Sequence, residues 1–218
     1  MKQLRVVVAL AVVGLLATAA VGWAANIKGT NGPDFLPGTA QNDRIRGLGG
    51  ADVIYGLGGS DHIEGAGGSD QINGDGTCPP GVTDPNYCSD DETKGGNDRI
   101  SAGSGNDVVQ GGRGNDTIRG NKGSDELDGE RGNDRVSGWE GNDMVRGGPG
   151  NDRLSGGKGS DEIFGGPGND TIFARDGERD IIHCGPGFDR VYADRGDSVS
   201  SDCERVTRGL GVLGQFVG

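Results

Sequence analysis

The chain has 218 residues, of which 47 are glycine, 31% are hydrophobic and 5% are aromatic, and its formal net charge at pH 7 is −12. So few large apolar side chains exclude an ordinary globular core, and the glycines do not recur at every third residue, which excludes collagen. The acidic balance argues against nucleic-acid binding and suits a cation as partner. Composition alone also fits a disordered acidic chain, so the choice depends on pattern.

Residues 1–25 have the features of a secretory signal peptide. Lys2 and Arg5 precede an apolar run, and the run ends in the small-residue stretch "AAVGWAAN". We predict cleavage within that stretch, which makes the mature protein secreted and leaves no stable membrane span. The alternative is an uncleaved membrane anchor, because the apolar run is just long enough to cross a bilayer.

Beyond this segment, aspartates recur in steps of nine residues, with one interruption. An aliphatic residue stands two positions after each of them, and glycine stands two positions before thirteen of the fourteen, the exception being Gln41. The fourteen aspartates are Asp34, Asp43, Asp52, Asp61, Asp70, Asp98, Asp107, Asp116, Asp125, Asp134, Asp143, Asp152, Asp161 and Asp170.

A period this short predicts a solenoid. Each unit has about six turn-forming residues followed by a three-residue strand, such as "TIR", whose middle residue points inward. Two units complete one coil of 18 residues, so repeat n stacks on repeat n+2. We therefore predict an all-β fold, a right-handed parallel β-roll in which two parallel sheets face each other across a thin aliphatic stack.

The stacking makes the aspartates candidate metal ligands. Coils about 4.8 Å apart would place the carboxylates of repeats n and n+2 almost on top of each other, where they repel unless a cation lies between them. Ca²⁺ accepts carboxylate and backbone carbonyl oxygens in forgiving geometry, whereas Mg²⁺ demands a tighter site and zinc favours His and Cys. Pairing n with n+2 allows up to about 12 calcium ions.

Three segments carry a family resemblance: "GGPGNDRLS" (147–155), "GGKGSDEIF" (156–164) and "GGPGNDTIF" (165–173). They resemble the Gly-Gly-x-Gly-x-Asp-x-U-x nonapeptide of RTX (repeats-in-toxin) proteins. The resemblance covers residues 29–173 and implies one Ca²⁺ between each turn and the turn stacked on it. With an N-terminal signal and four cysteines, the chain is similar to small secreted calcium-binding proteins of high-GC Gram-positive bacteria. The second repeat lacks its central glycine, so Asp34 and Asp43 mark the weakest sites.

The repeat defines the predicted organisation: a signal peptide at 1–25, a roll at 26–173 with an inserted loop at 74–96, a cap at 174–208 and a tail at 209–218. In the cap the aspartate spacing slips to ten, nine and eight residues, while Ile182, Val191 and Val199 keep the inward place. A metal-poor cap would cover the open end of the solenoid.

Four cysteines allow three pairings, and an exported chain favours oxidation. We predict Cys78–Cys88 within the loop and Cys184–Cys203 within the cap; free thiols are the alternative.

The sequence contains neither H-E-x-x-H nor G-x-S-x-G, and we predict no enzymatic activity. The favoured function is a secreted calcium-binding module that folds on binding Ca²⁺, in the extracellular space or at the cell envelope. The alternative is the non-catalytic roll of a secreted RTX-type toxin or hydrolase.

Sorting the outward residues by sheet gives one basic face. It carries Arg44, Arg46, Arg99, Arg119, Arg135, Arg153 and, from the cap, Arg190, whereas the opposite face carries Glu126, Asp128 and Glu162 with a single arginine, Arg146. We hypothesise that Arg99, Arg119, Arg135 and Arg153 bind an anionic cell-envelope polymer. The alternative is a solvated face whose arginines offset the acidic turns. If the insertion changed the parity of the coils, Arg44 and Arg46 would move to the other face.

Overall fold

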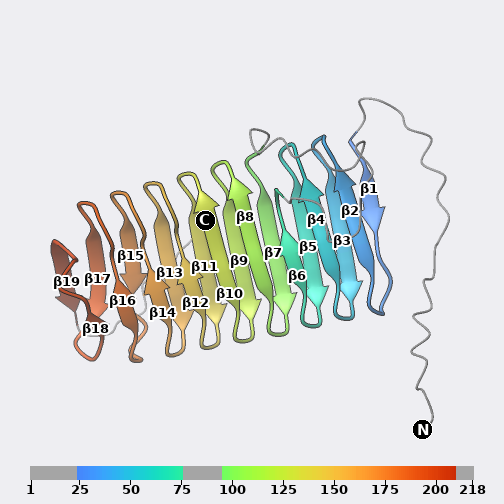
Figure 1. Ribbon diagram of the computed structural model, residues 1–218. Coiled ribbons are helices and arrows are strands. Elements are labelled where there is room, and N and C mark those ends of the chain that lie inside the picture. The colour runs from blue at the N-terminus through green and yellow to red at the C-terminus, as the bar shows by residue number, and fades with distance from the viewer. Residues whose placement is uncertain (1–23, 76–94, 210–218) are drawn as a thin grey trace, which may run out of the picture.

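A computed structural model describes residues 24–75 and 95–209. Every regular element in this part of the chain is a β-strand, and the strands form two parallel sheets that run the length of a solenoid (Figure 1). No helix in these residues is long and apolar enough to cross a membrane. The predicted signal peptide, up to residue 23, and the predicted Cys78–Cys88 disulfide lie outside the described residues.

Consecutive strands alternate between the two sheets, which is the arrangement that the nine-residue repeat predicts. The ten-stranded sheet contains β1 (Asn26–Lys28), β3 (Arg44–Gly49), β5 (His62–Gly67), β7 (Arg99–Ser104), β9 (Thr117–Lys122), β11 (Arg135–Glu140), β13 (Arg153–Lys158), β15 (Thr171–Ala174), β17 (Arg190–Asp194) and β19 (Arg205–Gly209). The nine-stranded sheet contains β2 (Phe35–Thr39), β4 (Val53–Leu57), β6 (Gln71–Asn73), β8 (Val108–Arg113), β10 (Glu126–Arg131), β12 (Met144–Arg146), β14 (Glu162–Phe164), β16 (Ile181–His183) and β18 (Ser198–Val199).

The register confirms that repeat n stacks on repeat n+2. Ile45 pairs with Ile63, 18 residues later, and Ile63 pairs with Ile100 across the insertion. The inserted residues therefore leave the parity of the coils unchanged. At the base of the insertion, Asp75 Oδ2 accepts hydrogen bonds from the backbone N–H of Gly96 at 3.1 Å and of Arg113 at 2.9 Å, which ties both ends of the loop to the next coil. The predicted β-roll is confirmed as an all-β solenoid of two parallel sheets.

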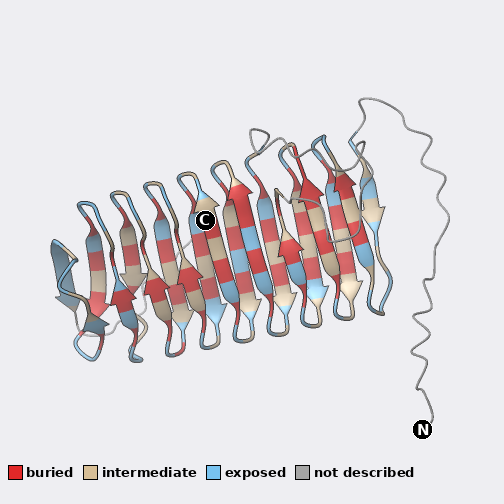
Figure 2. Ribbon diagram, viewed as in Figure 1, coloured by how far each residue is buried: buried red, intermediate tan, exposed pale blue. Residues whose placement is uncertain are grey.

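The core is a single stack of aliphatic side chains between the sheets. From β2 to β17 each strand buries the inward aliphatic residue, while the residues on either side face outward, so buried and exposed positions alternate in bands across the solenoid (Figure 2). Ile45, Ile118 and Leu154 are all fully buried at this position. The stack continues through Ile182 and Val191, with Val199 packed against it, so the coil extends into the predicted cap.

Many strands are longer than the three residues that the sequence predicts. β9 spans six residues because the pairing continues past Arg119 into the following glycine-rich segment, where Asn121 and Lys122 pair with Trp139 and Glu140. Successive coils follow the same backbone path even where the sequence favours a turn. The backbone amides of one coil therefore stay in register with those of the next, and the strand pairing continues.

Candidate metal centre

We number each repeat so that the aspartate is position 6 and the inward aliphatic residue is position 8. The aspartates follow tight turns along two edges of the solenoid, and most are almost completely buried. From Asp52 onward, one carboxylate oxygen of each, Oδ1, accepts a hydrogen bond from the backbone N–H of the aspartate one coil earlier. Thus Asp116 N–H donates to Asp134 Oδ1 at 2.7 Å, and Asp134 N–H donates to Asp152 Oδ1 at 2.8 Å. The structure therefore brings the predicted ligands into two continuous rows.

The second carboxylate oxygen, Oδ2, is buried and has no hydrogen-bond partner in fourteen aspartates of the described chain. The first aspartate row, which precedes strands of the ten-stranded sheet, contains Asp61, Asp98, Asp116, Asp134, Asp152, Asp170 and Asp189. The second aspartate row, which precedes strands of the nine-stranded sheet, contains Asp52, Asp70, Asp107, Asp125, Asp143, Asp161 and Asp180. A buried acceptor without a partner is costly, so an array of them indicates that these oxygens bind something other than protein.

The surroundings of each free Oδ2 consist of oxygen atoms and glycine. A Cβ built on Gly111 would lie 2.6 Å from Asp116 Oδ2 and 2.8 Å from the carbonyl oxygen of Gly129, in the next coil. A carboxylate oxygen and a backbone carbonyl oxygen thus share one small space beside position 1. Glycine is usual there but not obligatory, because Ala102 occupies position 1 of the Asp107 repeat and is fully buried. The site offers oxygen donors alone.

The turns depend on left-handed backbone conformations at positions 2 and 4. At position 4, Gly114 has φ 131° and Gly132 has φ 149°. At position 2 the same region is adopted even without glycine, at φ between 66° and 86°, by Leu48, Leu57, Ala66, Asn121, Glu130 and Trp139. Each such residue costs about 1–2 kcal/mol of backbone strain. The sequence departures at position 2 therefore leave the turn conformation intact.

The first two repeats differ from the rest. Asp34 Oδ2 accepts hydrogen bonds from Thr30, from N–H at 2.5 Å and from Oγ1 at 3.0 Å, and Asp43 Oδ2 accepts one from Thr39 N–H at 2.5 Å. Gln41, in place of the position 4 glycine, is not among the residues with positive φ. These two predicted ligands already have protein partners and do not belong to the two rows of free oxygens.

Asp180 and Asp189 extend the rows beyond the fourteen predicted ligands. Asp161 N–H donates to Asp180 Oδ1 at 2.9 Å, and Asp170 N–H donates to Asp189 Oδ1 at 2.7 Å. The slipped spacing predicts a metal-poor cap here, whereas Asp180 and Asp189 leave Oδ2 buried without a partner as the other row aspartates do. The signal that could have found them is the inward aliphatic residue two positions later, Ile182 or Val191.

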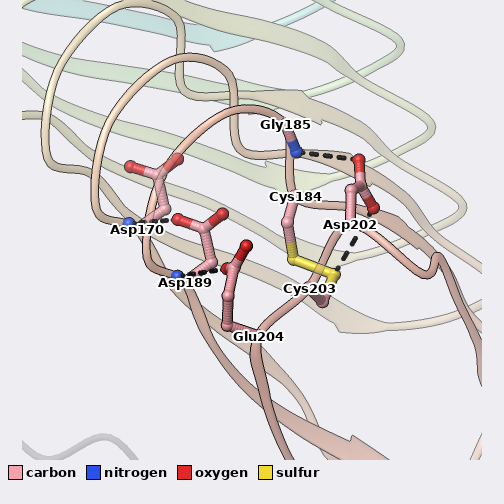
Figure 3. Close-up of a disulfide and its surroundings, with 7 residues drawn as sticks. All are labelled: Asp170, Cys184, Gly185, Asp189, Asp202, Cys203 and Glu204. Atoms are coloured by element: carbon pink, nitrogen blue, oxygen red, sulfur yellow. Dashed lines mark hydrogen bonds between the residues drawn. A yellow bond between two sulfur atoms is a disulfide. The ribbon is translucent and has the colours of Figure 1, made fainter.

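The rows end at the C-terminal coil. Glu204 Oε2 accepts the N–H of Asp189 at 2.9 Å, in the place where the next aspartate would stand (Figure 3). Asp197 ends the other row, because both of its oxygens accept backbone N–H groups, from Asp180 at 3.2 Å and from Asp194 at 2.5 Å.

The predicted disulfide between Cys184 and Cys203 is confirmed (Figure 3). Cys184 stands at position 1 of the Asp189 repeat and is fully buried. The bond links this coil to the segment after β18, and the N–H of the neighbouring Gly185 donates to Asp202 Oδ2 at 3.0 Å. The last coil is therefore held covalently to the roll.

Burial and stacking raise the pKa of the row aspartates. Burial is the main cause in each case, opposed by the hydrogen bond from the stacked backbone N–H, and the pKa of Asp134 rises to about 7 and that of Asp98 to about 8. Repulsion from stacked carboxylates adds to the rise, from Asp116 and Asp152 at Asp134. These carboxylates resist ionisation in the metal-free fold, and positive charge beside them would favour their ionised form.

A third ladder explains why position 5 favours Asn or Ser. The N–H of Asn115 donates to Asn97 Oδ1 at 2.6 Å, and the N–H of Asn133 donates to Asn115 Oδ1 at 2.8 Å. Where serine stands at this position, Ser60 Oγ accepts from the N–H of Asn97 at 2.9 Å. Short polar side chains thus satisfy turn amides that the sheets leave unpaired.

The four arginines of the hypothesised anion-binding face all lie on the outer face of the ten-stranded sheet. Arg99, Arg119, Arg135 and Arg153 are exposed, and Arg135 pairs in register with Arg153. Because the insertion preserves parity, Arg44 and Arg46 lie on this face as well.

The chemistry of the rows fits calcium. Among the described residues no group of three or more His, Cys, Asp or Glu side chains converges, so a metal between coils would depend on backbone carbonyls as well as carboxylates. Ca²⁺ accepts both kinds of oxygen in six- to eightfold coordination.

Comparison with known proteins agrees with this chemistry. A family model described as the RTX calcium-binding nonapeptide repeat matches residues 28–63, 49–76, 92–127, 110–145, 119–154 and 146–181. Together the matches cover more than half of the chain. No curated protein matches it. The chain belongs to the RTX calcium-binding nonapeptide repeat family.

Proposed function

We propose that this protein is a secreted, non-catalytic calcium-binding module that folds when Ca²⁺ neutralises its stacked carboxylates. The observation that carries the proposal is the set of fourteen buried Oδ2 atoms without a hydrogen-bond partner. Each aspartate uses Oδ1 to hold the coil beneath it and leaves Oδ2 for a ligand. The stacking of the coils and the binding of cations therefore depend on the same side chains.

The donor set favours Ca²⁺ over other metals. The rows contain neither histidine nor a thiol, so zinc would lack its usual ligands. Mg²⁺ requires nearly octahedral geometry and retains several waters, whereas Ca²⁺ tolerates irregular cages of carbonyl and carboxylate oxygens. Seven aspartates in each row leave six gaps between neighbouring coils, so we propose about twelve calcium ions. These gaps exclude Asp34 and Asp43 and include Asp180 and Asp189.

Calcium binding and folding are expected to be coupled. Each repeat buries one aliphatic side chain, which contributes about 1.5–3 kcal/mol, and ordering nine residues costs more than this. Without a cation the buried carboxylates oppose folding further, because burial raises the pKa of most of them well above 3.8. Bound Ca²⁺ would supply the positive charge that reverses this repulsion. We expect affinities typical of extracellular modules, roughly 10⁻⁴–10⁻³ M.

Two features support the proposal that the protein is secreted. The N-terminal 25 residues have the pattern of a signal peptide. Cys184 and Cys203 form a disulfide, which is typical of proteins in oxidising compartments. Low cytosolic calcium would keep the chain unfolded before export, and folding would follow outside the cell.

The test is far-UV circular dichroism of the mature chain in excess chelator, followed by titration with CaCl₂. The expected result is a largely unfolded spectrum that converts cooperatively to a β-sheet spectrum. A parallel titration with MgCl₂ is the control, and it should produce little of this change. A β-sheet spectrum that persists unchanged in chelator would contradict the coupling of folding to calcium.

A further inference from the structure

The two outer faces of the solenoid differ in charge. On the ten-stranded sheet, positions 7 and 9, which flank each inward residue, carry nine basic side chains and one acidic side chain, Glu64. The basic residues are Lys28, Arg44, Arg46, Arg99, Arg119, Arg135, Arg153, Arg190 and Arg205. At the same two positions of the nine-stranded sheet, the charged residues are Glu126, Asp128, Arg146 and Glu162. A protein with a net charge of −12 thus presents one strongly basic surface, which we call the arginine face.

The N-terminal part of the arginine face is partly neutralised by Glu64. Glu64 lies 3.6 Å from Arg44, 2.8 Å from Arg46 and 3.1 Å from His62. Further along, Arg153 lies over the ring of Phe173, 4.2 Å from its centroid.

Beyond the insertion, the arginine face has uncompensated charge. Five arginines there form no ion pair with any described residue: Arg99, Arg119, Arg135, Arg190 and Arg205. Since charges on neighbouring strands repel each other, this part of the face favours an anion from outside the chain.

The face is hollowed at its C-terminal end. Arg190 pairs in register with Arg205, and Tyr192 pairs with Thr207, across strands β17 and β19. These four side chains line a cavity of about 350 Å³. The ring of Tyr192 is held by stacking on Phe173, with centroids 5.1 Å apart and planes 7° apart. Two guanidinium groups, a phenol and a hydroxyl thus converge on one open site.

We propose that the arginine face binds a linear polysaccharide that carries carboxylate groups, with the Arg190–Arg205 hollow as its principal contact. Guanidinium groups bind carboxylates with two parallel hydrogen bonds, and strands about 4.8 Å apart repeat such groups along the sheet. Ser101, Thr117, Ser137 and Ser155 stand between the arginines on the same face and offer hydroxyl groups to the hydroxyls of a sugar chain. The opposite sheet carries Glu126, Asp128 and Glu162 at the equivalent positions, so a polyanion favours the arginine face. This interaction goes beyond calcium binding, which supplies only the folded surface.

The experiment measures binding of fluorescently labelled hyaluronan by anisotropy in saturating CaCl₂. The face variant carries Arg119→Gln, Arg135→Gln, Arg190→Gln and Arg205→Gln. The matched control carries Lys122→Gln, Arg131→Gln, Lys158→Gln and Arg179→Gln, which removes the same number of charges from turn positions and leaves positions 7 and 9 of the arginine face unchanged. We expect the face variant to bind about tenfold more weakly or worse, because each exposed ion pair changes affinity by up to a few fold and four are lost. The control should bind like the wild type.

Folding and specificity are checked in the same samples. All three proteins should give the same circular dichroism spectrum in calcium, since the substituted side chains are exposed. Binding should weaken as NaCl is added, and unlabelled hyaluronan should compete while uncharged dextran should not. Equal binding by the face variant and the control would overturn the proposal. Stronger competition by polyphosphate than by hyaluronan would overturn the assignment to a carboxylate polymer.

Discussion

Substitution of Gly132 by alanine should strongly destabilise the roll, although it adds only one methyl group. Gly132 has φ 149°, and a Cβ on it would overlap the carbonyl oxygen of Gly114 in the coil beneath. The obstacle is backbone, so no side chain can rotate to relieve the contact. The coils would have to separate, and the hydrogen bond from Gly114 N–H to Arg131 O, 2.9 Å long, joins the same two coils.

The magnitude follows from three contributions. A left-handed alanine costs about 1–2 kcal/mol, overpacking costs about 1–3 kcal/mol, and a weakened ladder hydrogen bond costs about 1 kcal/mol. The lower entropy of unfolded alanine returns about 0.4–1 kcal/mol. The net loss is therefore about 2–6 kcal/mol, a large part of the 5–15 kcal/mol that stabilises a typical domain.

Two other glycines separate the contributions. Gly177 has φ 97° and nothing within 4 Å of a built Cβ, so Gly177→Ala should cost only the backbone strain. Gly196 has no close neighbour either and is not among the glycines with positive φ, so Gly196→Ala should be neutral or slightly stabilising. The assay is urea unfolding in saturating calcium, followed by circular dichroism. If Gly132→Ala were as stable as Gly177→Ala, the close approach of the stacked turns would not be the reason that residue 132 must be glycine.

Three further predictions concern charge, pH and the disulfide. Asp134→Asn keeps an acceptor for Asp116 N–H but removes a buried charge, so it should raise the calcium concentration needed for folding. Asp34→Asn is the control and should change this concentration little, because Asp34 Oδ2 already accepts hydrogen bonds from Thr30. Equal midpoints of the two variants in a calcium titration would contradict the assignment of the row aspartates as calcium ligands. Without calcium, the pKa of the row aspartates in the folded state exceeds the unfolded value of 3.8, so the folded chain binds more protons than the unfolded chain and loses stability as pH rises through about 6 to 8. The β-sheet signal of the protein in chelator should therefore increase on acidification. Acid should weaken the calcium-bound form, because protons compete with Ca²⁺ for the same oxygens. Replacing both Cys184 and Cys203 with serine opens a link across 19 residues and should lower the free energy of unfolding in calcium by about 3 kcal/mol, and an unchanged urea midpoint would show that the bond does not stabilise the last coil.

The fold could be predicted because each structural role in the repeat, turn or core, is filled by one kind of residue at a fixed position. Aspartate marks the end of every turn, and the aliphatic residue two positions later marks the core, so the register of Ile63 on Ile100 follows even across the insertion. The strand lengths could not be predicted in this way. Continued pairing at Asn121 and Lys122 depends on the next coil repeating the same path, and local propensity does not report this.

The candidate site was predictable in its chemistry but not in its limits. The free oxygens begin at Asp52 rather than Asp34, because Thr30 and Thr39 donate to the Oδ2 atoms of the first two repeats. They continue to Asp189, because the coil absorbs changes in repeat length and still aligns the carboxylate with Asp170 N–H. Both limits depend on contacts between residues, which spacing alone does not specify.

The central claim is that calcium binds between the stacked carboxylates. The most direct measurement is anomalous scattering from calcium in crystals of the mature protein grown in CaCl₂. The account predicts two rows of anomalous peaks along the turn edges of the solenoid, each beside the Oδ2 atoms of neighbouring coils from Asp52 to Asp189, and none beside Asp34. Peaks absent from both rows, or confined to exposed carboxylates such as Glu126 and Glu140, would contradict it.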